Sequence, residues 1–508
     1  MFARVKTVGL FGMNAFEVDV EVERSRGMDK LEIVGLADVS VRESRERISS
    51  AFRSCEIPFP RGRVIVNLAP ADVKKSGSSQ DLAIAVSIML SSGIIGEECT
   101  QGSAFMGELS LGGELRPING VLPMVLSARR AGIKRVFVPK DNAFEASVAE
   151  GLEVFGVGTL RELLEHLLGK RRLPVMPEFV PREEDSLYSL DFSQVRGQRF
   201  AKTALEIAAC GGHNLIMIGA PGSGKSMLAK RMPTILPKMT LGESIETTNI
   251  YSIAGMIDKN SPLVTKRPFR SPHHTVSSAG LVGGGSIPRP GEISLAHNGL
   301  LFLDELPEFD RSSLEILRQP IEDGRVTISR AMGTVTYPAD IMIVAAMNPC
   351  PCGYYGHPKR SCSCTPRQVG GYLSKVSGPL LDRFDLHVEV APVEYSSLSS
   401  DESEESSAEI LKRVEKAREI QKRRYLGTGI SCNARLTPEL MRTHCRLTDS
   451  ADKLLGDAFE RLGLSARAHD KILKVARTIA DMSGEELIDK SHIAQAIRYR
   501  NLDRKYWK

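Results

Sequence analysis

The chain has 508 residues, of which 42% are hydrophobic and 25% are charged. This is the composition of a globular protein, and it excludes the collagen-like, disulfide-scaffold and wholly disordered classes. Lys and Arg total 67 against 62 for Asp and Glu, so the formal net charge of +5 is too small to indicate nucleic-acid binding without local basic clusters.

Neither a targeting segment nor a membrane span is predicted. No long apolar run follows Arg4 and Lys6, and the most apolar stretch, 82–95, is interrupted by serines. That stretch is also shorter than the roughly 20 residues that a membrane span needs. Nine cysteines without a secretory signal indicate a reducing compartment, so we expect a cytoplasmic protein.

The first part of the chain, residues 1–168, is predicted to form a self-contained α/β domain. Apolar and acidic residues alternate from Phe16 to Glu23, a period of two that predicts a half-buried strand. Ser40 and Glu43 have the spacing of a capping box, which predicts the start of a helix. The other expected elements are strands at 31–34, 63–68 and 135–139 and helices at 81–90 and 127–131.

Residues 169–190 contain three prolines and no apolar period, which predicts a linker. Short apolar runs at 215–218, 300–303, 341–347 and 386–390 then predict a second α/β domain over 191–394, with a parallel sheet covered on both faces. An acidic, serine-rich linker is expected at 395–407. Residues 408–508 are predicted to be helical, with helices near 408–424, 437–445, 449–461 and 465–482 and a last one from 490.

A phosphate-binding loop is predicted at residues 219–226, which read GAPGSGKS and match G-x-x-x-x-G-K-[ST]. An apolar strand precedes this stretch and a helix follows it, which disfavours the alternative of a glycine turn without a ligand. The loop would bind ATP through its backbone N–H groups, its lysine and a serine that ligates Mg²⁺. Its residues are Gly219, Ala220, Pro221, Gly222, Ser223, Gly224, Lys225 and Ser226.

Polar residues follow the later predicted strands at the edge where open α/β sheets bind ligands. After the run 300–303, Asp304 is expected to hold Mg²⁺ and Glu305 to polarise the attacking water. Asn348 ends the run 341–347 and could reach the γ-phosphate, or it could only begin the turn before Pro349. Arg383 precedes the last strand and could serve a neighbouring protomer as a trans finger or pair with a nearby aspartate.

These motifs resemble AAA+ ATPases, specifically the magnesium-chelatase-like group and within it the ComM/YifB family. The resemblance is carried by DFSQVRGQ (191–198), GAPGSGKS (219–226), residues 269–309, AAMNPCPCG (345–353) and SGPLLDRFDLHVEV (377–390). It implies a ring, usually a hexamer, with ATP between subunits. It also implies that Asn348 is a sensor, that Arg383 is a finger acting in trans, and that Arg467 is a second sensor in a C-terminal helical lid.

The N-terminal domain resembles the Lon-protease catalytic fold, on the strength of GELSLG (107–112) and RRAGIK (129–134). Ser79 occupies the position of the nucleophile, but Met124 stands where that family has its lysine. A serine without an amine base is not activated. We therefore expect a non-proteolytic scaffold or DNA-binding module.

Four cysteines within fifteen residues predict a small metal site. Their C-x-C half-sites could build one tetrahedral Zn²⁺ centre, and free thiols or a redox switch are the alternatives. The four are Cys350, Cys352, Cys362 and Cys364.

Two loops are locally basic, and in a ring they could face a central pore and contact DNA phosphates without reading sequence. The alternative is a solvated surface. The residues are Lys266, Arg267, Arg270, His273, His274 and Arg289 in one loop, and Lys359, Arg360 and Arg367 in the other.

The sequence thus favours a ring-forming ATPase that translocates single-stranded or branched DNA, with branch migration during natural transformation implied by the family. Three alternatives stay open: a chelatase-type motor that remodels a protein partner, an ATP-dependent protease, and a protein that uses ATP only to oligomerise.

Overall fold

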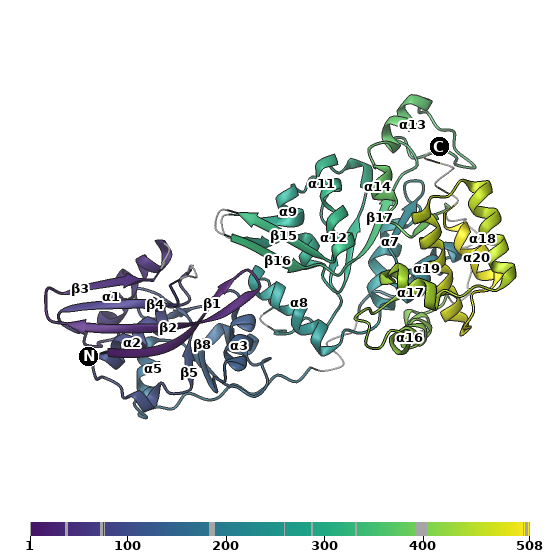
Figure 1. Ribbon diagram of the computed structural model, residues 1–508. Coiled ribbons are helices and arrows are strands. Elements are labelled where there is room, and N and C mark those ends of the chain that lie inside the picture. Colours follow the sequence, from purple (N-terminus) through teal and green to yellow (C-terminus); the bar gives the residue numbers. More distant parts are fainter. Residues whose placement is uncertain are drawn as a thin grey trace.

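The computed structural model describes the chain except residues 1, 36–38, 72–74, 76, 182–187, 259, 286–287, 331–332, 393–403, 501, 503–505 and 507–508. The side chains of 39, 40 and 42 are also outside the description, so the expected capping contact of Ser40 lies beyond it, as does most of the predicted acidic linker. The molecule is elongated, with an N-terminal sheet at one end, a second sheet in the middle and a helical bundle at the other end (Figure 1).

A seven-stranded sheet forms the N-terminal part, in the order β3-β4-β2-β1-β5-β8-β9. Its alternating strand buries Val18, Val20 and Val22 completely, as the period of two predicts. The bounds are β1 Phe2–Phe11, β2 Asn14–Ser25, β3 Lys30–Val34, β4 Arg63–Ala69, β5 Ser103–Phe105, β8 Arg135–Pro139 and β9 Glu153–Val157, with a small hairpin of β6 Glu108–Leu109 and β7 Leu115–Arg116.

The helices in the same part of the chain as this sheet are α1 Val39–Ser54, α2 Asp81–Ser91, α3 Val121–Arg130, α4 Ala143–Ala146 and α5 Leu160–Leu167. Every residue of α2 is buried, which explains its apolar sequence on all sides. Helix α3 begins earlier than the predicted 127–131, because Pro123 lies in the first turn, where no backbone N–H is needed for a helical hydrogen bond.

The second sheet has five parallel strands in the order β11-β14-β17-β10-β18. They are β11 Phe269–Arg270, β14 Leu300–Leu303, β17 Met342–Met347, β10 Leu215–Ile218 and β18 Leu386–Glu389. All residues of β10, β14 and β17 are buried, as expected for a parallel sheet with helices on both faces. The two-residue edge strand β11 was not anticipated, because it is too short to show a period.

The helices of this central part are α6 Arg199–Gly211, α7 Lys225–Arg231, α8 Leu241–Ala254, α9 Ser278–Val282, α10 Glu292–Leu295, α11 Arg311–Ile316, α12 Arg318–Asp323, α13 Pro366–Leu373 and α14 Gly378–Leu381. Two hairpins extend from it: β12 Gly283–Gly284 with β13 Arg289–Pro290, and β15 Arg325–Arg330 with β16 Gly333–Pro338. Helix α8 joins the N-terminal part, where the Gly120 amide donates to the Ser252 carbonyl at 3.0 Å.

The C-terminal bundle consists of α16 Ser407–Arg424, α17 Pro438–His444, α18 Asp449–Leu462, α19 Ala466–Ser483 and α20 Lys490–Arg498, close to the predicted helices. Among the described residues no helix combines the length and apolar character needed to cross a bilayer.

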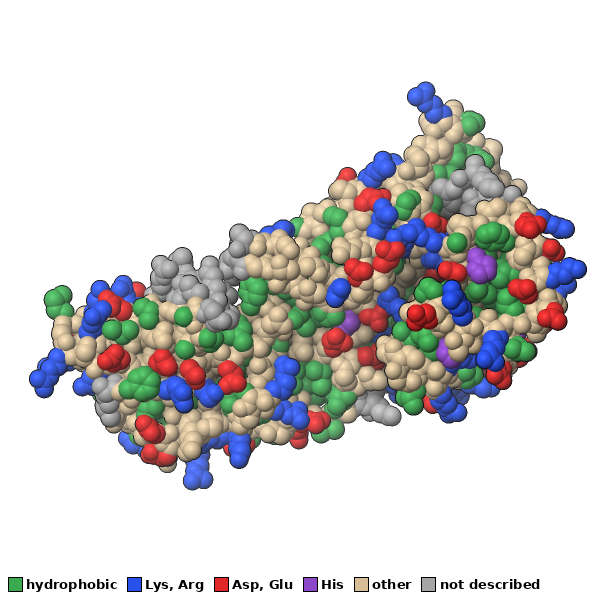
Figure 2. All heavy atoms as spheres, viewed as in Figure 1, with side chains coloured by type: hydrophobic (Ala, Val, Ile, Leu, Met, Phe, Trp, Pro, Cys, Tyr) green, Lys and Arg blue, Asp and Glu red, His purple; other side chains and the backbone are tan. Residues whose placement is uncertain are grey.

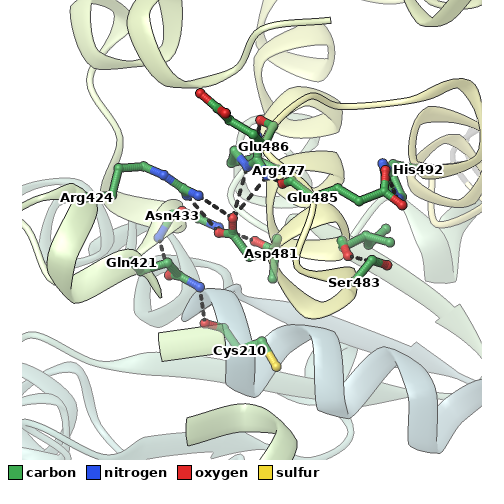
Figure 3. Close-up of polar contacts among 12 residues, drawn as sticks. Cys210, Gln421, Arg424, Asn433, Arg477, Asp481, Ser483, Glu485, Glu486 and His492 are labelled. Atoms are coloured by element: carbon green, nitrogen blue, oxygen red, sulfur yellow. Dashed lines mark hydrogen bonds and ion pairs between the residues drawn. The ribbon is translucent and has the colours of Figure 1, made fainter. Parts of the chain in front are cut away.

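A buried carboxylate holds the bundle together. Asp481 accepts hydrogen bonds from Arg424 at 2.8 and 2.5 Å, from Arg477 at 3.1 Å and from Asn433 at 2.8 Å (Figure 3). Gln421 links this cluster to the central part, because its amide donates to the Cys210 carbonyl at 2.9 Å. The bundle is therefore fixed to α6 through polar contacts as well as apolar packing.

We expect Asp481→Ala to destabilise the bundle by about 3–5 kcal/mol, because it would leave the buried guanidinium group of Arg477 and the half-buried one of Arg424 without a counter-charge. The urea midpoint of unfolding, followed by circular dichroism, measures this loss. Asp457→Ala is the matched control, since Asp457 is exposed on α18 and its replacement is expected to change stability by no more than about 0.5 kcal/mol. Equal midpoints for the two variants would contradict the role of Asp481.

Candidate active site

Three neighbouring parallel strands bring the predicted site residues to one edge of the sheet. Ile218 at the end of β10 lies opposite Met347 at the end of β17, and Leu303 at the end of β14 lies opposite Ala345. The residues that follow these strand ends are Gly219, Asp304 and Asn348. Three positions that are far apart along the chain therefore meet at the carboxyl edge, where open α/β sheets bind ligands.

The loop 219–226 turns tightly into α7. Gly222 and Gly224 have φ angles of 76° and 91°, in the left-handed region that favours glycine. An added Cβ at either position would meet no atom within 4 Å, so the backbone conformation and not crowding requires glycine here. The turn ends at Lys225, the first residue of α7, so the helix N-terminus faces the loop.

The ammonium group of Lys225 has only neutral acceptors among the described residues. It donates to the carbonyls of Gly219 at 2.7 Å and Ala220 at 3.0 Å, and Asn348 Oδ1 lies 3.3 Å away. Burial lowers the pKa of Lys225 to about 8, while the nearby charges of Asp304 and Glu305 oppose this shift. A buried cation without a bonded anion is a position at which a phosphate oxygen would be stabilised.

Two hard oxygen donors lie beside this lysine. The Ser226 hydroxyl donates to Asp304 Oδ2 at 2.6 Å, so the hydroxyl oxygen and the carboxylate lie directly next to each other. A hydroxyl and a carboxylate are ligands that Mg²⁺ prefers, together with phosphate oxygens and water. The residues present therefore fit a magnesium ion bound with nucleotide.

Glu305 extends beyond the strand end with more than half of its side chain exposed. Its φ of 52° places the backbone in the left-handed region, and its amide donates to Asp304 Oδ1 at 3.0 Å. The carboxylate Oε2 lies 3.4 Å from Nδ1 of His274, a residue that follows the edge strand β11. We did not anticipate this contact, because the sequence shows only a polar pair at 273–274 in a loop.

The two arginines that were predicted to act on nucleotide, Arg383 and Arg467, do not lie at the phosphate loop 219–226 of their own chain. Arg383 has an exposed side-chain fraction of 8%, pairs with Glu322 and donates to the Pro379 carbonyl at 3.0 Å. Arg467 is exposed in the first turn of α19. Within the described part of the chain, no hydrogen bond or ion pair joins either arginine to residues 219–226.

A cavity of about 780 Å³ lies at the opposite end of the same strands. It is lined by Gly299 and Met342, at or just before the starts of β14 and β17, and by Arg418 and Tyr425 at α16. The candidate active site does not coincide with it. The candidate active site is located instead by the carboxyl ends of β10, β14 and β17 and by the polar residues that follow them.

Comparisons with known proteins agree with this arrangement. The family described as "Magnesium chelatase, subunit ChlI" matches residues 191–398, "Subunit ChlI of Mg-chelatase" matches 20–142, and the ChlI C-terminal family matches 404–500. Over 97% of its length the chain is 42% identical to "Competence protein ComM" of Haemophilus influenzae, of which it covers 96%. It is also 42% identical to "Uncharacterized protein YifB" of Salmonella typhimurium, over 99% of this chain and 97% of that protein.

The chain belongs to the ComM/YifB family of magnesium-chelatase-like AAA+ proteins. Membership suggests ATPase activity and implies ATP and Mg²⁺. A Lon protease of Lachnoclostridium phytofermentans is 27% identical over 30% of this chain and 20% of its own length, which agrees with the expected N-terminal resemblance.

In this ComM/YifB chain the four cysteines converge as their spacing predicts. The Sγ atom of Cys350 lies 3.4 Å from that of Cys352 and 3.7 Å from that of Cys362, and all four Sγ atoms lie within 4.8 Å of one another. Four thiolates around one Zn²⁺ at about 2.3 Å need a separation of this size, so the residues fit zinc.

The cysteine loop also packs on the phosphate loop. A Cβ added to Gly353 would lie 2.4 Å from Pro221 Cδ, a distance too short for any side chain to fit. Cys350 follows Asn348 by two residues and is fully buried. A metal centre here would therefore stabilise the segment that positions Asn348.

The N-terminal part of this family member keeps Met124 in an apolar cluster, with an exposed fraction of 1%. Ser79 is half-buried, and its carbonyl accepts from the Gly107 amide at 2.8 Å. The side chain of Met124 has no titratable group and cannot activate a serine.

The basic loops differ from the expectation at two positions. Arg270 forms a bidentate ion pair with Glu292 at 2.6 and 2.7 Å, and Arg267 pairs with Glu243 at 3.3 Å. These guanidinium groups stabilise the fold and are not free for phosphates. Exposed cations remain at Lys266, Arg289, Lys359, Arg360 and Arg367. Basic and acidic side chains are interspersed across the face shown in Figure 2.

Proposed function

We propose that this ComM/YifB family member is a ring-forming ATPase that couples ATP hydrolysis to movement along single-stranded or branched DNA. Branch migration in homologous recombination during natural transformation is the process we assign to it. The observation that carries the ATPase part is the meeting of Lys225, Ser226, Asp304, Glu305 and Asn348 at one sheet edge.

In this proposal each residue has a separate task. Lys225 binds phosphate oxygens with its ammonium group, and the backbone N–H groups of the loop support it. A Mg²⁺ ion held by Ser226 and Asp304 would neutralise phosphate charge. Glu305 accepts a proton from the attacking water, and Asn348 orients that water or the γ-phosphate.

The remaining roles need a second protomer or the lid. Arg383 acts as a finger on nucleotide bound by the adjacent protomer, and Arg467, at the start of α19, senses nucleotide from the lid. The exposed position of Arg467 leaves its guanidinium available for a ligand. We propose a hexamer, the usual ring of such ATPases.

DNA is proposed as the partner on two grounds. A relative that is 42% identical over nearly the whole chain has the name "Competence protein". The exposed cations, among them Arg289 and Arg360, could contact phosphates without reading bases. A chelatase-type motor that remodels a protein partner is the second candidate, because the matched family is described as a magnesium chelatase subunit.

The decisive experiment measures ATP turnover alone and with single-stranded, duplex and branched DNA, each at two salt concentrations. We expect stimulation by DNA that weakens at the higher salt, because phosphate contacts release counterions. Turnover that DNA leaves unchanged but a protein partner raises would overturn DNA translocation and support the chelatase-type motor. Casein degradation would revive the protease alternative.

We further propose that Zn²⁺ occupies the four-cysteine site. Purified protein is expected to contain about one zinc per chain, and Cys352→Ser to lose it and to bind ATP more weakly through the contact of Gly353 with Pro221. Elemental analysis and titration with a fluorescent ATP analogue measure the two effects. Cys99→Ser, outside the cluster, should keep the metal. Metal-free wild-type protein prepared with reductant and zinc present would contradict the assignment.

A further inference from the structure

The finger segment, residues 383–387, is bonded to the C-terminal bundle through the carboxylate of Asp385. Lys471 on α19 donates from Nζ to Asp385 Oδ1 at 2.7 Å, and the two side chains are only 17% and 10% exposed. The second oxygen, Oδ2, accepts from the Asn214 amide at 3.2 Å and lies 3.3 Å from His213 Nδ1. An ion pair so far removed from water is costly to break, because breaking it would leave an uncompensated charge.

The end of the bundle holds the same segment at two further points. Arg500, which follows α20 and is 5% exposed, donates from Nη1 to the Phe384 carbonyl at 2.8 Å. The amide of His387 donates to the Tyr499 carbonyl, also at 2.8 Å. The residues that follow Arg383 are therefore bonded to the bundle, and the direction of the backbone at Arg383 depends on it.

The side chain of Arg383 has no comparably firm contact of its own. Its counter-ion Glu322 is 55% exposed, and an ion pair with an exposed partner contributes little to holding a side chain in one place. A finger has to place its guanidinium at the transferring phosphate, and a displacement of about 1 Å can lower a rate by about 10². The precision of the finger must therefore come from the buried contacts between its segment and the bundle.

We propose that Lys471 is a positioning residue for Arg383. Its ion pair with Asp385 fixes the finger segment to the bundle and so directs the guanidinium at the nucleotide of the adjacent protomer. The inference rests on the proposed function and adds the residue that positions the finger. Arg467 lies one turn before Lys471 on the same side of α19, so a tilt of this helix would move both arginines. We assign Lys471 no contact with nucleotide.

The test measures kcat and KM for ATP in the full-length chain. Lys471→Met is expected to lower kcat by about 10- to 100-fold, the effect of a displaced finger, and to leave KM nearly unchanged. Lys474→Met is the matched control, because Lys474 is also half-buried on α19 but donates to the Ala434 carbonyl at 3.1 Å. This control should keep the wild-type kcat.

A second variant separates lost positioning from lost folding. Lys471→Met alone leaves the buried Asp385 without its cation, whereas the double variant Asp385→Asn, Lys471→Met removes both charges. We expect the urea midpoint of the double variant to stay near that of the wild type, and its kcat to fall as in the single variant.

Mixed rings show which nucleotide site the lysine serves. Lys471→Met mixed with Lys225→Ala should recover part of the turnover, because Lys225→Ala protomers supply intact fingers to the intact phosphate loops of the other variant. Mixed with Arg383→Ala, it should show no more turnover than it has alone, because neither protomer then supplies a working finger.

Three results would overturn the inference: a wild-type kcat in the double variant, an equal fall in Lys474→Met, or recovery in any pattern other than with Lys225→Ala alone. Recovery with Arg383→Ala alone would mean that Lys471 serves the nucleotide of its own protomer, and recovery in neither mixture that it only supports the fold. Full turnover in Arg383→Ala would instead refute the proposed finger itself, and its positioning with it. A wild-type rate that DNA does not change would contradict only the DNA part of the proposed function, because none of these measurements uses DNA.

Discussion

Replacing Arg383 with alanine is expected to lower ATP turnover by a factor of about 10³ or more while ATP still binds. A guanidinium that stabilises charge on the transferring phosphate contributes an effect of this size. Arg383 pairs with Glu322 and donates to the Pro379 carbonyl, and within the described part of the chain no hydrogen bond or ion pair joins it to residues 219–226. We therefore expect its partner site to lie on the adjacent protomer.

A mixing experiment tests the action in trans. Arg383→Ala and Lys225→Ala are each expected to be inactive, and mixed rings to recover part of the turnover, because some interfaces then combine an intact loop with an intact arginine. Arg129→Ala, an exposed arginine on α3, controls for lost surface charge. Full turnover in Arg383→Ala, or a protein that remains monomeric with ATP and DNA present, would contradict the assignment.

Glu305→Gln is expected to reduce hydrolysis by a factor of about 10²–10⁴, because glutamine cannot accept the proton of the attacking water. ATP binding should persist, since Lys225, Ser226 and Asp304 are unchanged. Single-turnover hydrolysis and fluorescent-nucleotide titration separate the two steps. If Glu305→Gln also loses its activity on DNA, a protein that uses ATP only to oligomerise is excluded. Such a protein would keep that activity, because it needs ATP to bind and not to be hydrolysed.

Glu308→Gln is the matched control for this substitution. Glu308 is an exposed carboxylate three residues further along the chain, and it pairs with Lys375 at 3.2 Å. We expect its turnover to match wild type. An equal loss in both variants would indicate that charge near the strand end, and not proton acceptance by Glu305, sets the rate.

Local signals predicted most of the candidate site. The glycine spacing of 219–226 reflects a turn that needs positive φ, and the buried strands show as short apolar runs that end at Asp304 and Asn348. The cysteine spacing predicted a cluster because both half-sites lie within one short loop. Each of these signals depends on neighbours in the sequence, and so a linear pattern can reveal it.

The contacts that tie distant segments together were decided by the tertiary structure alone. His274 reaches Glu305 because an edge strand of two residues pairs with β14, and a strand this short has no period to detect. Arg267 and Arg270 have the same basic character in sequence as exposed Arg289, yet the fold supplies acidic partners to the first two. The sequence by itself thus determined the local turns and strand ends, whereas strand order and helix packing decided which charges meet.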